Sequence, residues 1–145
     1  MTPWIILGTF FGTLLIMSAL SWTPFPEWVT KKWLIFTHKD ERPKLNGRTA
    51  GYWIHLYPYG DGNVQAAVEH EMVHITQNWR YSWLLVVFLR AVSDRMVLRF
   101  EAQAFAVSHL NGRSLDYCAE TLANEYNIDG LTVEEARKAI LRWVE

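Results

Sequence analysis

The sequence predicts a small α+β domain preceded by an N-terminal hydrophobic helix. Residues 4–22 carry no charged side chain, which sets this stretch apart from the remainder of the chain. Two short runs of bulky apolar residues then lie between turn-forming stretches, and the chain after residue 63 divides into helical segments. We therefore expect a hydrophobic helix over residues 1–28 and a domain with a short antiparallel sheet plus helices over residues 29–145.

The length and composition are those of one compact domain, because 145 residues are too few for two of ordinary size. Half of the residues are apolar, which provides ample material for a core. The formal net charge is −1, so we expect no nucleic-acid partner. Cys118 has no second cysteine to pair with in the chain, so we expect a small buried hydrophobe that fits a reducing compartment.

The N-terminal stretch WIILGTFFGTLLIMSALSW, residues 4–22, has the length and flanks of a membrane anchor. As a helix it reaches roughly 28 Å, close to the ~30 Å hydrocarbon thickness of a bilayer. Trp4 and Trp22 bracket it as interfacial aromatic residues do, and Pro24 and Pro26 end the helix just outside. The sequence therefore predicts a single-pass membrane protein.

Two alternatives to an anchor stay open for this segment. A cleaved signal peptide normally has a basic residue before the apolar run, and this chain has none there. A helix packed on a partner would use the small residues between positions 8 and 13. For an anchor, the basic residues that follow between positions 31 and 48 predict a cytoplasmic C-terminal domain by the positive-inside rule.

Two strands are expected ahead of the first helix of the domain. KKWLIFTH, residues 31–38, and RTAGYWIHLYP, residues 48–58, flank a polar turn-forming stretch, so we expect them to form an antiparallel pair. Asn63 is a good N-cap for a helix that reaches about Arg80. Its apolar stripe, which we expect to be the packed face, comprises Val64, Val68, Met72, Ile75 and Trp79.

The remaining helices follow from caps and breaks. Residues 83–92 are too few to span a membrane, so this segment is a packed helix or lies against the bilayer surface. A helix capped by Ser93 reaches Leu110, and further helices cover residues 114–126 and 133–144. Thr132 and Glu135 form a capping box for the last one.

The stretch VEHEMVHITQNWR, residues 68–80, carries the residues with chemical potential. His70 and His74 are about 400° of helical rotation apart, so both imidazoles lie on one face and can bind one ion. They lie about 200° from the apolar stripe, away from the side that we expect to be packed. Glu71 is rotated about 100° from His70, where its carboxylate would lie beside the ion and accept a proton.

A catalytic zinc site needs a third protein ligand and one open position. The downstream candidates are Asp94, Glu101 and His109. Glu101 shares a helix face with apolar residues, where a carboxylate is costly unless a cation compensates it. Asp94 and His109 are explained by the helix dipole at the two ends of the same helix, so Glu101 is the best candidate.

HEMVHITQ, followed by EAQAFA with its Glu 27 residues after His74, resembles the gluzincin branch of zincin metallopeptidases. The resemblance covers roughly residues 33–110 and implies a zincin-like fold, with Zn²⁺ bound by His70, His74 and Glu101, and with Glu71 as general base. Gln77 is similar to the last position of the compact HExxHxxQ members, which are often bacterial or phage-borne. The transition-state-stabilising residue of the family has three candidates here: His109, Tyr117 and Tyr126.

Three functions remain open from the sequence. We expect a small membrane-anchored zinc metalloendopeptidase, a hydrolase acting on a peptide or protein, with the strand at 48–58 pairing with the substrate backbone. The alternative is a non-catalytic zincin-like module with a structural or assembly role, for example in a phage or membrane complex. A third possibility is hydrolysis of a cell-wall peptide or amide, which would require an outward-facing domain. The oligomeric state and the substrate preference are left open.

Overall fold

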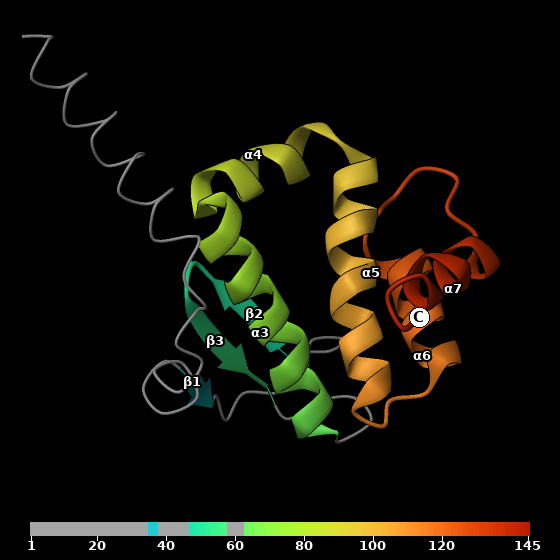
Figure 1. Ribbon diagram of the computed structural model, residues 1–145, viewed down its shortest axis with the longest axis horizontal. Coiled ribbons are helices and arrows are strands. Elements are labelled where there is room, and N and C mark those ends of the chain that lie inside the picture. The colour runs from blue at the N-terminus through green and yellow to red at the C-terminus, as the bar shows by residue number, and fades with distance from the viewer. Residues whose placement is uncertain (1–34, 38–46, 58–62) are drawn as a thin grey trace, which may run out of the picture.

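The computed structural model describes residues 35–37, 47–57 and 63–145, and shows an α+β domain (Figure 1). The hydrophobic segment predicted over residues 1–28 lies outside these residues. Among the described residues, no helix combines the length and the apolar character needed to cross a membrane.

The sheet contains β1 (Ile35–Thr37), β2 (Gly47–Ala50) and β3 (Trp53–Leu56) in the order β1-β3-β2. The predicted antiparallel pairing of the two runs is wrong, because β1 pairs with β3 in parallel. The antiparallel pair lies within the second run, between β2 and β3. Gly51, at φ +65°, reverses the chain there, and Ala50 faces Trp53 across a two-residue turn.

α3 (Val64–Tyr81) packs on the sheet and begins where the sequence predicts. The Asn63 side chain caps it by accepting a hydrogen bond from the Ala66 N–H at 3.0 Å. The apolar stripe contributes to the contact with the sheet, although Val64 at its start is 61% exposed. The cluster between helix and sheet consists of Ile54, Leu56, Ala67, Met72 and Ile75.

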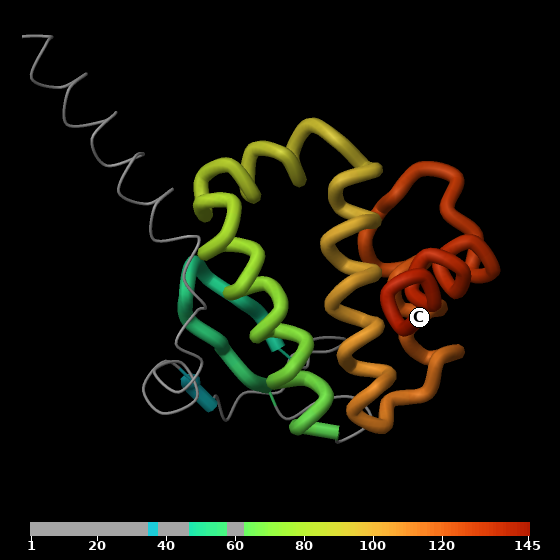
Figure 2. The backbone as a smooth tube through the Cα atoms, in the orientation of Figure 1, coloured from blue at the N-terminus to red at the C-terminus, as the bar shows by residue number. Residues whose placement is uncertain are grey.

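α4 (Trp83–Val92) joins α3 to α5 (Asp94–Leu110), and the tube in Figure 2 shows it bridging one end of these two long helices. α3 and α5 lie side by side (Figure 1). Ser93 caps α5 by accepting a hydrogen bond from the Met96 N–H. The histidine face of α3, which we expected to lie away from the packed side, is therefore buried against α5, and the opposite face covers the sheet.

α6 (Leu115–Glu125) and α7 (Val133–Leu141) pack on the other side of α5. The capping box of Thr132 and Glu135 is present at the start of α7. Cys118 is fully buried, as expected. The core between these helices contains Ala102, Phe105, Ala106, Cys118, Ala119, Leu122, Ala136 and Ile140. α5 therefore has one face in this apolar core and another against α3.

Candidate metal centre

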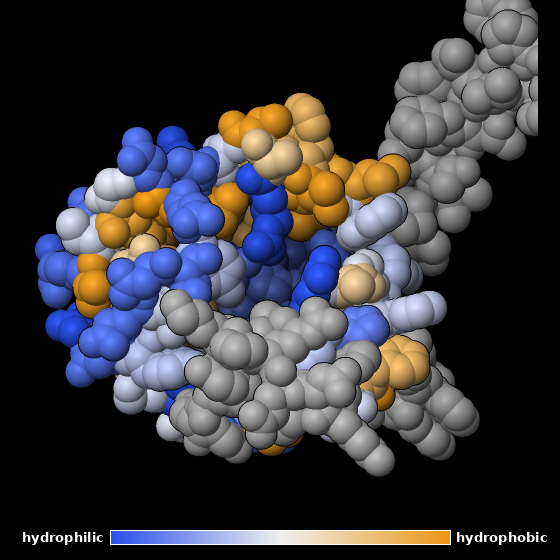
Figure 3. All heavy atoms as spheres, turned by 180° about the vertical axis from the view of Figure 1, so that it is seen from behind, coloured by the Kyte–Doolittle hydropathy of each residue, from blue (hydrophilic) through white to orange (hydrophobic). Residues whose placement is uncertain are grey.

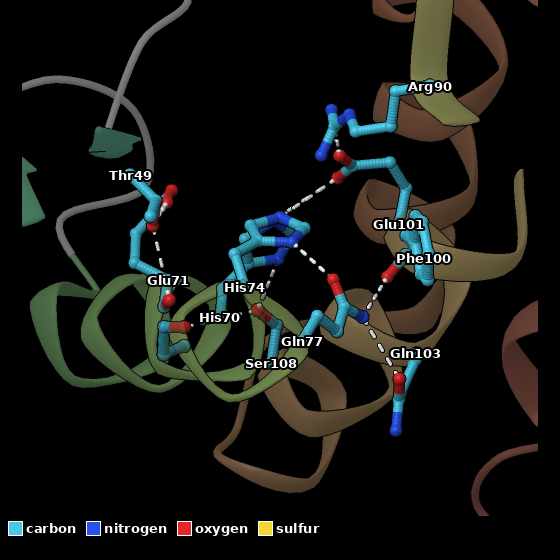
Figure 4. Close-up of polar contacts among 11 residues, drawn as sticks. Thr49, His70, Glu71, His74, Gln77, Arg90, Phe100, Glu101, Gln103 and Ser108 are labelled. Carbon is cyan, nitrogen blue, oxygen red and sulfur yellow. Dashed lines mark hydrogen bonds and ion pairs between the residues drawn. The ribbon is translucent and has the colours of Figure 1, made fainter. Parts of the chain in front are cut away.

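Three predicted ligand residues converge between α3 and α5. The Nε2 atoms of His70 and His74 lie 3.2 Å apart. Oε2 of Glu101 lies 3.5 Å from Nε2 of His70 and 3.3 Å from Nε2 of His74. All three residues are buried, with Glu101 only 1% exposed. Periodicity brought the two imidazoles together on α3, and packing of α5 brings the carboxylate to them (Figure 4).

The proton of His74 is placed by Gln77, one turn further along α3. Nε2 of Gln77 donates to the carbonyl oxygen of Phe100 at 3.1 Å and to Oε1 of Gln103 at 2.9 Å. The amide oxygen of Gln77 therefore faces Nδ1 of His74, at 3.0 Å. Because this oxygen can only accept, Nδ1 carries the proton, and Nε2 of the neutral ring keeps a free lone pair.

Ser108 does the same for His70. Its Oγ donates to the carbonyl oxygen of Ala66 at 3.1 Å and lies 3.3 Å from Nδ1 of His70. With the hydroxyl hydrogen used, Oγ accepts from Nδ1–H, so Nε2 of His70 also keeps its lone pair. In the neutral tautomers, both imidazoles thus direct a lone pair towards the same carboxylate oxygen.

Such a convergence of lone pairs requires a positive charge. Oε2 of Glu101 is buried and has no hydrogen-bond partner among the residues that the structure describes. Burial alone would lower the pKa of His74, but the negative charge of Glu101 outweighs it and raises this pKa to about 9. Burial would likewise raise the pKa of Glu101, yet the charge of His74, the close approach of both imidazoles and the charge of Arg90 hold it well below its usual range. Without a metal ion, a proton on His74 supplies the missing charge.

The donor set and its spacing also fit a metal ion. In a tetrahedral site with ligand atoms about 2.0–2.1 Å from zinc, neighbouring ligand atoms lie about 3.3–3.4 Å apart. The three separations here, 3.2, 3.3 and 3.5 Å, have this size. The outer partners that hold ligand rings in metal sites are also present, as Gln77 and Ser108. His70, His74 and Glu101 thus form a buried group that could hold a metal ion.

Arg90, from α4, binds the other oxygen of Glu101. Its NH2 group lies 2.5 Å from Oε1, and its side chain is one-third exposed. The pair leaves Oε2 as the oxygen that faces the histidines (Figure 4). Arg90 therefore orients the carboxylate and offsets its charge, and any ion at the three residues would meet one available oxygen of Glu101.

Glu71 lies beside the group and is held by the sheet. Oγ1 of Thr49, on β2, donates to Oε2 of Glu71 at 2.6 Å. Gly47 approaches so closely that a Cβ atom there would lie 3.0 Å from Oε1 and Cγ of Glu71. A glycine at this position of β2 leaves room for the carboxylate, so strand and glutamate are fitted to each other.

A cleft of about 310 Å³ connects these groups. It is bounded by β2, α3, α4 and α5, and its lining includes Glu71, His74 and Glu101. Tyr126, which follows α6, lines it as well. Burial, and then the charges of Glu101 and Glu71, raise the pKa of Tyr126 well above its usual range, so its hydroxyl keeps its hydrogen at neutral pH.

The rejected candidates lie elsewhere in the fold. Oδ2 of Asp94 accepts from the backbone N–H of Asp129 at 3.5 Å, and His109 Nδ1 contacts the carbonyl oxygen of Arg113 at 2.9 Å. The Arg113 guanidinium also lies over the ring of Tyr117. Of the three candidates for a transition-state-stabilising residue, the cleft brings in Tyr126 alone.

Three further residues of the site were not found from the sequence. Ser108 lies seven residues after Glu101, two helical turns along the same face, which is a signal that could have identified it. Arg90 is the one charged residue in the apolar segment 83–92, a weaker signal. Thr49 gave none, because its role depends on how the sheet packs on α3.

Comparisons of the chain with protein-family models, with curated proteins and with solved structures give no match.

Proposed function

We propose that this protein is a zinc-dependent peptidase. The observation that carries the proposal is the buried group of His70, His74 and Glu101, with Glu71 on the same cleft. Two imidazoles and one carboxylate are a donor set of catalytic zinc sites, which keep a fourth position for water or substrate. A purely structural zinc site more often has four protein ligands and no free carboxylate beside it.

The chemistry divides between the ion and the chain. Zinc, when bound, polarises the scissile carbonyl and lowers the pKa of water towards about 7. Glu71 accepts the proton of the attacking water and delivers it to the leaving amine. Thr49 holds one carboxylate oxygen of Glu71, which leaves the other for proton transfer. Tyr126 keeps its hydrogen and donates a hydrogen bond to the oxygen on which negative charge develops.

β2 offers a place for the substrate backbone. Among the described strands it lies at the edge, in the order β1-β3-β2, and its residues Gly47 and Thr49 line the cleft. An extended peptide that pairs with such an edge gains main-chain hydrogen bonds largely independent of its sequence. Its scissile bond would then lie beside Glu71. This arrangement supports a peptide or protein as the substrate class.

The test combines metal analysis with cleavage of a broad peptide library by the purified full chain. We expect one zinc per chain, and Glu71→Gln should keep the metal while cleavage falls by at least ~100-fold, as loss of a general base predicts. Glu69→Gln is the matched control: Glu69 lies on the same helix, bonds Gln65 and lies outside the cleft lining, so metal and cleavage should be unchanged. Equal activity in Glu71→Gln and wild type contradicts the assigned base.

A non-catalytic zincin-like module is the second candidate. One observation favours it: the three residues are at most 8% exposed, a degree of burial that structural metal sites also show. Its role would be in assembly, for example in a phage or membrane complex. Stoichiometric zinc together with no cleavage by the wild-type chain would favour this candidate, and absence of zinc would exclude both.

The membrane anchor over residues 4–22 and the cytoplasmic location of the domain are part of the proposal. They follow from the sequence alone, since this segment lies outside the described residues. Protease added to intact cells should leave a C-terminal tag uncleaved, and permeabilised cells should lose it. Cleavage in intact cells would instead place the domain outside and favour a cell-wall substrate.

A further inference from the structure

α4 exposes large apolar side chains on its outer side. The residues concerned are between 45% and 60% exposed, and we call them the α4 apolar face: Trp83, Leu84, Leu85, Val87, Phe88 and Val92. Figure 3 shows hydrophobic side chains gathered at the top of the molecule, above a hydrophilic hollow. The inner side of the same helix is packed, since Val86 is 4% exposed and Arg90 binds Glu101. α4 is thus apolar at Val86 on its inner side and along its exposed outer side, and Arg90 is its one charged residue.

The charged side chains around this face are mostly basic. Residues 72–93 contain no Asp or Glu. Arg80 precedes α4, and Asp94, Arg95 and Arg99 follow it; all four side chains are exposed, and three of them are basic. A helix that exposes Trp, Phe and Leu between basic residues has the composition of helices that lie in the interface of an anionic bilayer. A protein partner of the same chemistry would need acidic residues around an apolar groove, whereas an anionic bilayer provides both over its whole surface.

The chain itself brings this face near a bilayer. Residues 4–22 carry the sequence pattern of an anchor, and the first described strand begins at Ile35. The thirteen steps from residue 22 to residue 35 span at most about 45 Å even when extended. An anchored domain is therefore confined to the membrane surface, and a modest affinity of the α4 apolar face is sufficient to orient it.

We propose that the α4 apolar face is a membrane-docking surface that seats the cleft against an anionic bilayer. α4 forms one wall of the cleft through Trp83, Val86, Val87 and Arg90. Docking of its outer side places the opening next to the lipid headgroups. The substrate of a cleft in this position is a polypeptide segment that lies on, or emerges from, the membrane surface. The docking stands on the exposed residues alone, while the substrate class rests on the proposed peptidase function.

The docking is tested with a fluorescent label on the full chain in phosphatidylcholine–phosphatidylglycerol vesicles. Cys118 is fully buried, so a new exposed cysteine is labelled selectively. Phe88→Cys reports on the face, and Leu110→Cys is the matched control, since the two side chains are 60% and 64% exposed and Leu110 ends α5. We expect nitroxide lipids to quench the label at position 88 and iodide in the buffer to quench the label at position 110.

Two results would overturn the docking. Iodide quenching at position 88 equal to that at position 110 would show that the face stays in water. Protection from both quenchers would show that protein covers it, either the N-terminal segment or a second copy. Arg80→Glu combined with Arg95→Glu should weaken lipid quenching at position 88 several-fold, and unchanged quenching would refute the charge argument.

The substrate class is tested with one peptide in solution and the same peptide tethered to the vesicles. Leu84→Ser with Phe88→Ser, both outside the cleft lining, should leave zinc content and cleavage of the free peptide unchanged. Cleavage of the tethered peptide should fall about tenfold, and equal loss on both peptides would refute the substrate class. If wild type cleaves neither, the peptidase proposal fails while the quenching result still decides the docking.

Discussion

The candidate metal centre and the C-terminal core differ in how they are completed, although both are buried and both use α5. The core around Cys118, Leu122 and Ile140 is apolar, and its residues are fully buried without an unmatched charge. At the candidate metal centre, Glu101 is just as buried, but its Oε2, which has no hydrogen-bond partner within the described part of the chain, faces two imidazole lone pairs. Hydrophobic contact completes the first region, whereas the second needs a cation. Perturbations of the two should therefore separate metal binding from folding.

Glu101→Ala should have the largest effect of the variants, and this effect should be on zinc binding. It removes one ligand and leaves Arg90 and both histidines facing an empty space. We expect zinc affinity to fall by more than the ~10–100-fold that loss of an outer partner costs. Isothermal titration with zinc measures this, and zinc should no longer raise the melting temperature. Unchanged zinc affinity would show that a residue other than Glu101 is the third ligand.

Ile140→Ala perturbs the C-terminal core. The side chain is fully buried among the residues of α5, α6 and α7. Its truncation should lower the free energy of unfolding by about 2–5 kcal/mol, because it removes apolar burial and leaves a cavity. Zinc bound per folded chain should stay at the wild-type value. Urea unfolding with parallel metal analysis gives both quantities, and a loss of zinc from the folded variant would show that the two regions are not independent.

The metal-free protein should become less stable as pH rises from 6.5 to 9. The pKa of His74 is raised from 6.5 to about 9 by Glu101 in the folded state, so the folded chain holds this proton more tightly than the unfolded chain. The stabilisation is complete below pH 6.5 and is lost as pH rises through 9. It amounts to roughly 3 kcal/mol, because each tenfold gain in proton affinity corresponds to ~1.4 kcal/mol.

Urea midpoints of the EDTA-treated protein across this range provide the measurement. Glu101→Gln is the control, because it removes the charge that raises the pKa of His74. A flat profile for wild type, or the same slope in Glu101→Gln, contradicts the assigned charge balance. The other residues of the C-terminal core carry no ionisable side chain, and Cys118 is the same in both proteins, so the difference between the two profiles reports the charge of Glu101.

In the fold, features that depend on interactions between residues close in the sequence were predicted correctly, and features that depend on distant segments were not. The start of α3 at Asn63, the capping box before α7 and the shared face of His70 and His74 are local, and all three predictions are confirmed. The strand pairing was wrong because Gly51 creates a hairpin inside one run and a distant segment, β1, supplies the parallel neighbour.

The site shows the same division between local and distant interactions. The convergence of Glu101 with the histidines could be inferred, because a carboxylate among apolar residues requires a cation. The burial of the histidine face of α3 could not, because α5 provides it. Arg90 and Thr49 reach the site from a connecting helix and an edge strand, and no periodicity within their own segments points there.

Gln77→Met should have the smallest effect of the variants. It tests whether the outer partners of the histidines, and not only the three ligands, distinguish the candidate metal centre from the C-terminal core. Methionine is close to glutamine in shape, but its sulfur is only a weak acceptor, so the buried N–H of His74 loses its strong partner and the tautomer with a free Nε2 is less favoured. Zinc affinity should fall about 10–100-fold, while the apolar core and the helix remain as they are. Gln65→Met, at an exposed position of the same helix, is the control and should bind zinc like wild type. If Gln77→Met also binds zinc like wild type, the lone pairs of this site are not set by their outer partners, and the contrast with the C-terminal core reduces to the three ligands alone.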